Sequence, residues 1–197
     1  MRYTSYVASA RLGLVALCGI LSASTAQPTS PGHLQGEFSV QATEHCIHSS
    51  GFGPPPVMEA LGPTVLENTT LQGVLILRAD GSGEFTGRSA SITTSSIGSP
   101  MQQSTLRCPV IYSIDREGVL RLDRACKGTV VRGSLSVGGQ VWSTSSVQLD
   151  GRFHAATGSL QLTDSALEIE TLTSFHGART PRVCTRAWSA VRTGRGT

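Results

Sequence analysis

Short segments in which apolar and polar residues alternate cover most of this chain, and Gly, Asp and Ser turns separate them. Successive side chains of a β-strand point to opposite faces, so this alternation is typical of antiparallel strands with one buried face. Phe38, Val40 and Ala42 show the pattern in a first strand at about 36–44. No segment keeps a helical period over several turns. The sequence therefore predicts an all-β protein.

Turn residues divide the pattern into hairpins. Asp-Gly-Ser-Gly at 80–83 predicts a tight turn within a hairpin that spans 71–91. Gly-Gly at 138–139 predicts a similar hairpin that spans 129–149. A last strand is expected at about 182–191, with Trp188 as its core anchor.

Two further turns are predicted in the C-terminal half. Asp-Gly at 150–151 predicts a two-residue turn that places Val147 opposite His154. Asp-Ser at 164–165 predicts a turn that sets two apolar pairs on one face, Leu162 with Leu167 and Leu160 with Ile169.

Two long loops interrupt the strands. The segment near 48–68 contains three consecutive prolines, which cannot donate to a β-ladder, and we expect one helical turn at 57–61. The Ser- and Thr-rich segment near 90–104 predicts a second loop. The total of about 8–10 strands predicts a single antiparallel up-and-down β-barrel, with a β-sandwich as the alternative.

The N-terminal segment has the order of a secretory signal peptide. Arg2 and Arg11 come without any acid, and an apolar run and then small residues follow up to residue 26. The sequence thus predicts a cleaved signal peptide at 1–26 and a single mature domain at 27–197, secreted or periplasmic. The apolar run is shorter than the roughly 20 residues that span a bilayer, and no later run is longer. We expect a monomer without a transmembrane segment.

Four cysteines remain in the mature chain, and an even number is typical of an oxidising compartment. Cys108 and Cys126 are equally distant from residue 117, the centre of a predicted turn, so the hairpin places them opposite each other. Residues in such a pair lie about 4.5 Å apart at Cα, within the disulfide range. Cys46 and Cys184 then form the second disulfide, which in a closed ring joins the first and last strands.

Charge excludes one class of partner. The chain has 16 basic and 13 acidic residues, for a net charge of +3, which falls to about +1 without the signal peptide. This balance gives no electrostatic basis for binding nucleic acid. Lys127 is the only lysine and Asn68 the only asparagine, a bias that a GC-rich bacterial genome would produce.

Candidate chemical sites are sparse. His45, Cys46 and His48 look like metal ligands, but residues three apart on a strand point to opposite faces, and Cys46 is assigned to a disulfide. Glu168 and Glu170 share one side of a strand, which is the minimum for a catalytic carboxylate pair. They alternate with apolar neighbours, so we interpret them as part of a solvated outer face. We predict no catalytic residue, cofactor or metal site.

Gly36-Glu37-Phe38 on the first strand, followed by a meander, resembles the glycine-x-aromatic opening of calycin barrels such as the lipocalins. The resemblance covers these three residues and the overall strand order. It implies a similar architecture and transfers no ligand-binding residues.

Our first functional hypothesis is a secreted, non-enzymatic barrel that binds a small apolar ligand inside or a protein partner at its rim. Calycin-like barrels that inhibit secreted proteases make the second version concrete by analogy. Long loops often carry function, so the candidate contacts are Phe52, Pro54, Pro55 and Pro56.

Two other classes remain open. One is a secreted hydrolase-type enzyme whose site is assembled only in three dimensions, with Glu168, Glu170 and His154 as available residues. The other is a structural component of the cell envelope. An apolar cavity would favour ligand binding, a cleft that collects acids and histidine would favour catalysis, and a filled barrel would favour surface interaction.

Overall fold

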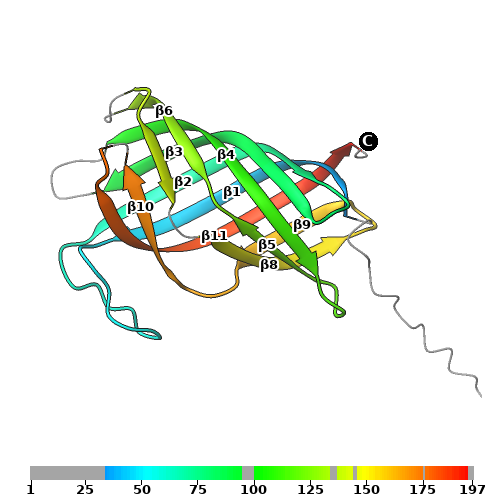
Figure 1. Ribbon diagram of the computed structural model, residues 1–197, viewed down its shortest axis with the longest axis horizontal. Coiled ribbons are helices and arrows are strands. Elements are labelled where there is room, and N and C mark those ends of the chain that lie inside the picture. The colour runs from blue at the N-terminus through cyan, green and yellow to red at the C-terminus, as the bar shows by residue number, and fades with distance from the viewer. Residues whose placement is uncertain (1–33, 95–99, 134–136, 144–145, 175, 195–197) are drawn as a thin grey trace, which may run out of the picture.

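The computed structural model describes residues 34–94, 100–133, 137–143, 146–174 and 176–194. The predicted signal peptide lies outside these residues. None of the described residues belongs to a helix that could cross a membrane. They form eleven antiparallel strands in one sheet (Figure 1). The strands are β1 (Gly36–His48), β2 (Val65–Leu77), β3 (Ser82–Thr94), β4 (Met101–Ile114), β5 (Val119–Arg124), β6 (Lys127–Gly133), β7 (Gln140–Ser143), β8 (Val147–His154), β9 (Ser159–Asp164), β10 (Ile169–Ser174) and β11 (Arg179–Gly194).

The sheet closes on itself because β1 pairs with both β2 and β11. One barrel-like ring of eight strands has the order β1-β2-β3-β4-β5-β8-β9-β11. The long strand β4 pairs with β5 along one half of its edge and with β6 along the other half. In the same way, β11 pairs with β9 along one half and with β10 along the other. Since β7 joins β6 to β10, a second ring, β1-β2-β3-β4-β6-β7-β10-β11, closes beside the first. The rings share five strands.

This architecture confirms the predicted all-β, antiparallel ring. It has more strands than expected, and the order is not a simple meander, because after β5 the chain returns to pair β6 with β4. Strands β3 and β4 also occupy most of the segment near 90–104 that the sequence assigned to a loop.

The first long loop lies at 49–64, and it folds back on itself as a small hairpin. The Gly53 amide donates to the Glu59 carbonyl at 2.8 Å, and Phe52 forms an isolated β-bridge with Ala60. Figure 1 shows this loop projecting from one end of the rings.

The prediction of a turn at 150–151 was wrong. Residues Val147–His154 form the single strand β8, and the chain turns after His154 instead. A Cβ atom on Gly151 would lie 1.8 Å from the carbonyl oxygen of Gln161 on β9. This glycine therefore serves a close approach between two strands and not a turn.

The predicted hairpin around 164–165 was also wrong. Strand β9 pairs with β8 and β11, so Leu160 lies opposite Ala190 and Leu162 opposite Trp188. The Asp164 carboxylate accepts a hydrogen bond of 2.9 Å from Arg186 Nη1, which directs it toward β11. The hairpin at 138–139 is correct for β6 and β7, but its second half divides into β7 and β8.

Apolar side chains fill the first ring. Phe85 and Trp188 pack with ring centroids 5.0 Å apart, and Trp188 is 2% exposed, as its predicted role as a core anchor requires. Gly73 and Gly87 face each other beside Phe85, where a Cβ on either would come within 2.8 Å of its ring. Leucines of β2, β5, β8 and β9 complete this core.

Both disulfides have the pairing that the sequence predicts. Cys46 and Cys184 link β1 to β11, with their Cα atoms 4.1 Å apart. Cys108 and Cys126 are also 4.1 Å apart at Cα, and the β4–β5 pairs around them share the predicted centre at residue 117. Two disulfides are compatible with an oxidising compartment.

Candidate functional site: a polar cavity beside a buried ionic network

The second ring encloses a cavity of about 340 Å³. Every strand of that ring contributes to its wall, and Arg124 of β5 and Cys126 lie at its inner limit. Its polar wall consists of Glu44, His48, Glu67, Thr69, Ser89, Ser91, Thr93, Gln102, Ser104, Arg124, Thr180 and Arg182. Its apolar wall includes Val65, Leu71, Leu106, Val141 and Leu172.

The change from a filled to a hollow interior follows the inward-facing positions of each strand. On β3 the inward position is Phe85 in the first ring and then Ser89, Ser91 and Thr93 in the second. Short hydroxyl side chains cannot fill the space that leucine and phenylalanine occupy. The alternation of inward and outward positions is unbroken, and only the chemistry of the inward positions changes.

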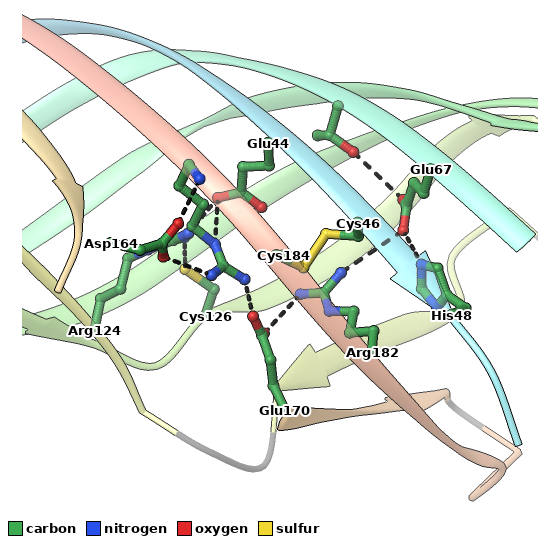
Figure 2. A network of polar contacts seen from close by, with 12 residues as sticks. Glu44, Cys46, His48, Glu67, Arg124, Cys126, Asp164, Glu170, Arg182 and Cys184 are labelled. Carbon is green, nitrogen blue, oxygen red and sulfur yellow. Dashed lines mark hydrogen bonds and ion pairs between the residues drawn. A yellow bond between two sulfur atoms is a disulfide. The ribbon is translucent and has the colours of Figure 1, made fainter. Parts of the chain in front are cut away.

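Acidic and basic side chains form a continuous buried network between the apolar core and the cavity (Figure 2). Arg124 Nη2 donates to Glu44 Oε1, and Arg186 Nε lies 3.5 Å from the same oxygen. Arg186 also donates to Asp164 and, through Nη2, to Glu170 Oε1. Strands β1, β5, β9, β10 and β11 are thus connected by charged contacts.

The network continues along the cavity wall. Arg182 Nη2 donates to Glu170 Oε2 at 3.1 Å, and its Nη1 lies 3.7 Å from Glu67 Oε2. His48 Nε2 donates to the same Glu67 oxygen at 2.7 Å. Contacts therefore run without a break from His48 to Arg124, across both rings.

Glu44 and Glu67, the two acids of the network that line the cavity, have pKa values below their usual value in the folded protein. Burial by itself would raise the pKa of Glu44, but the guanidinium groups of Arg124, Arg186 and Arg182 outweigh it and lower this pKa below its usual value. Burial likewise opposes ionisation of Glu67, whose pKa the hydrogen bond from His48 and the charge of Arg182 nevertheless lower. These carboxylates act as fixed negative charges.

Among the three arginines of the network, Arg124 contacts the fewest carboxylates. Its guanidinium stacks on Trp188, 4.7 Å from the ring centroid, and Nη1 donates to Cys126 Sγ at 3.0 Å. Its Nε atom is buried without a hydrogen-bond acceptor. Burial, which has the largest effect, and the nearby charge of Arg186 together lower the pKa of Arg124 below its usual value. A single carboxylate, Glu44, offsets this charge.

The structure does not bring the candidate catalytic residues together. Glu170 is 4% exposed and belongs to the network, whereas Glu168 is exposed in the segment before β10. The interpretation of both as a solvated outer face was wrong for Glu170, because Arg182 and Arg186 pair with it inside the ring. His154 is exposed on β8, beside the turn to β9.

His45 and His48 point to opposite faces of β1, as predicted. His45 is exposed, and its Nδ1 lies 2.7 Å from Asn68 Oδ1. His48 faces the cavity and bonds to Glu67. Within the described part of the chain, no three His, Cys, Asp or Glu side chains are grouped as a metal ion would require.

The candidate contact loop is only partly exposed. Phe52 is half-buried at the base of the hairpin, and Pro54, Pro55 and Pro56 are exposed near its tip. Val57, which follows them, is 79% exposed. None of these residues lines the cavity.

The charged residues that define the site were not found from the sequence. Glu44 is in phase with the inward-facing Phe38, Val40 and Ala42 on β1. Arg186 is in phase with Trp188 on β11 in the same way. The sequence did contain this information, because a charged residue at an inward-facing position of a strand requires a partner inside the protein.

Comparisons with protein-family models, curated proteins and solved structures find no match to this chain. The case for function therefore rests on the cavity and its surroundings.

Proposed function

We propose that this protein is a secreted, non-enzymatic binding protein that holds a small, polar, hydroxyl-bearing molecule in its cavity. The observation that carries the proposal is the cavity itself, about 340 Å³, whose wall combines many hydrogen-bonding side chains with a larger apolar surface. Small-molecule sites typically have volumes of about 300–1,000 Å³, so the space suits a compact ligand.

The charges in the wall support a ligand without net charge. Two acids, Glu44 and Glu67, face two cations, Arg124 and Arg182, and each of these four already has an oppositely charged partner. An ion of either sign would compete with these pairs. A neutral molecule can instead add hydrogen bonds to them.

The uncharged part of the wall supports hydroxyl groups on the ligand. Serine and threonine hydroxyls and the Gln102 amide can each donate and accept, and hydroxyl groups match both roles. Leu106, Val141 and Leu172 form an apolar side that suits the C–H face of a compact ring. The wall therefore suits a ligand that has both hydroxyl groups and an apolar face, in place of the wholly apolar ligand that we expected from the sequence.

The state of the acids favours binding over catalysis. A general acid or base needs a pKa near the working pH. The pKa values of Glu44 and Glu67 lie below their usual value, and guanidinium or imidazole groups contact both carboxylates. The predicted signal peptide and the two disulfides support export to an oxidising compartment.

Native mass spectrometry of the mature protein, purified from its own host, tests this proposal. We expect a non-covalently retained small molecule. Ser104→Phe would place a large ring in the cavity and should abolish retention, because Ser104 is buried in the wall. Ser113→Phe is the matched control, since Ser113 lies on the same strand with an exposed side chain.

Circular dichroism and an unfolding curve establish that both variants fold. A wild-type mass equal to that of the bare chain would contradict the proposal. So would a retained mass that survives in Ser104→Phe.

A further inference from the structure

The exposed apolar side chains gather at one end of the molecule. We call the end where β1 finishes and β2 begins the cavity end, and the opposite end the charged end. Thirteen large apolar residues are exposed in the described chain, and three of them, Ile76, Ile111 and Val191, lie toward the charged end. Leu167 lies in the segment before β10, and the other nine lie at the cavity end, namely Ile47, Val57, Leu61, Leu66, Ile92, Met101, Val131, Val137 and Ile169.

The strand residues of this group form a belt on the outer face. Ile169 lies opposite Val183, Val183 opposite Ile47, and Ile47 opposite Leu66, across β10, β11, β1 and β2. Ile92 on β3 lies opposite Met101 on β4 and continues the belt. His45 and Asn68 are polar side chains within it, and they are hydrogen bonded to each other.

We propose that the cavity end docks on the surface of a lipid bilayer. The belt crosses six of the eight strands of the second ring and so faces outward in many directions, and the loop at 49–64 projects from the same end (Figure 1). One flat protein surface could cover one side of such a convex end, whereas shallow insertion into lipid covers all of it. Two outward positions along a strand span about 7 Å, which matches the roughly 5–10 Å depth of interfacial insertion.

The distribution of charge supports the same occupant. The turns of the charged end contain Arg78, Asp80, Arg116 and Glu117, all exposed. At the cavity end the exposed charged side chains are Glu59, Arg132, Glu168 and Arg179, and the two arginines can meet lipid phosphates at the border of the belt. The nine exposed apolar side chains of this end outnumber its four exposed charged ones, and this excess suits the uncharged acyl region. This inference does not depend on the proposed ligand.

Flotation with phosphatidylcholine vesicles tests the proposal with the purified, oxidised mature protein. We expect the wild-type protein to float with the vesicles and to stay bound in high salt. Val57→Asp/Leu61→Asp should weaken the partition by about tenfold or more, because two exposed apolar side chains leave the contact. Ile111→Asp, a change at the charged end, should bind like the wild type.

The variants sit in a loop and on an exposed surface, and unfolding curves verify that they fold. Absence of wild-type protein from the floated fraction would overturn the proposal, as would equal partition of the loop variant and Ile111→Asp. A dimer in sedimentation equilibrium that Val57→Asp/Leu61→Asp dissociates, without vesicle binding, would assign the belt to a second copy. Ser104→Phe should still bind vesicles, which separates this result from that for the cavity ligand.

Discussion

Glu44 is the residue on which the buried network most depends, because a single carboxylate oxygen faces both Arg124 and Arg186. Removing one partner of a buried ion pair leaves an uncompensated charge, which costs more than removing both. The same oxygen lies at the boundary between the apolar core and the cavity. Its loss should therefore affect both stability and the cavity wall.

Glu44→Leu should lower the free energy of unfolding by about 3–5 kcal/mol, because it leaves Arg124 buried beside Trp188 without a carboxylate. Glu44→Leu/Arg124→Met should recover a large part of this loss. Urea unfolding of both single variants and the double variant measures the coupling. If the two single losses simply added in the double variant, the pair would not act as a unit.

Acid should destabilise the protein through Glu44 and Glu67. Both have pKa values below 4.5 when folded. Their ionisation therefore contributes stability that is present above about pH 4.5 and is lost as the pH falls through the lower, folded pKa. We expect the urea concentration at the unfolding midpoint of the wild type to decrease as the pH is lowered from about 5 to about 3.

Glu67→Gln should show a smaller fall in this range than the wild type, since one of the linked groups is absent. Glu117→Gln, at an exposed turn, is the control and should follow the wild type. Identical pH profiles for Glu67→Gln and the wild type would contradict the assignment.

At the scale of elements, Gly151 shows how closely β8 and β9 approach. A Cβ atom there would meet the Gln161 carbonyl oxygen at 1.8 Å and the Leu162 Cα at 2.9 Å, and both belong to the backbone. Gly151→Ala should lower stability by about 1–3 kcal/mol, because β9 must shift to admit the methyl group. Gly51→Ala, where the nearest atom lies at 3.7 Å, is the control. A chemical unfolding midpoint that Gly151→Ala leaves unchanged would show that the strands separate freely.

Gly151 also illustrates why the sequence predicted some elements correctly and others not. Alternation identified β1 and β11, and the turn centred at residue 117 gave the register of β4 and β5. An Asp-Gly pair, however, occurs both at a turn and where two backbones approach, and only the neighbouring strand distinguishes the two. Nor could alternation show that β4 and β11, with 14 and 16 residues, each pair with two partners along one edge.

The site was hidden for a related reason. Charged residues on a strand are usually exposed, and Glu170 was therefore interpreted as part of an outer face. In the structure its apolar neighbour Ile169 is 40% exposed and Glu170 faces Arg182 and Arg186. Where the interior is polar, the charged residues of a strand face inward and its apolar residues face outward. The sequence of the strand alone does not show this, because the partners of the charged residues are distant in sequence.

At the scale of the whole molecule, the features that stabilise the fold and those that carry the proposed functions lie mainly in different rings. The first ring has the apolar core, the second has the cavity and the exposed apolar belt, and the ionic network connects the two rings. Cys46–Cys184 lies where the ends of the chain close both rings, since β1 and β11 belong to each. Cys108–Cys126 joins neighbouring segments at the junction of β5 and β6.

Loss of the ring-closing disulfide should therefore be the more damaging change. The cysteines of Cys46–Cys184 are separated by 138 residues and those of Cys108–Cys126 by 18. Loop entropy then gives stabilisations of about 5 and about 3 kcal/mol. Cys46→Ala/Cys184→Ala should show the lower urea midpoint, and Cys108→Ala/Cys126→Ala is the matched comparison. A lower midpoint for Cys108→Ala/Cys126→Ala would contradict this order. It would mean that the hydrogen bonds between β1 and β11 hold the rings closed without the covalent link, and that the contact of Cys126 with Arg124 contributes more to stability than chain entropy does.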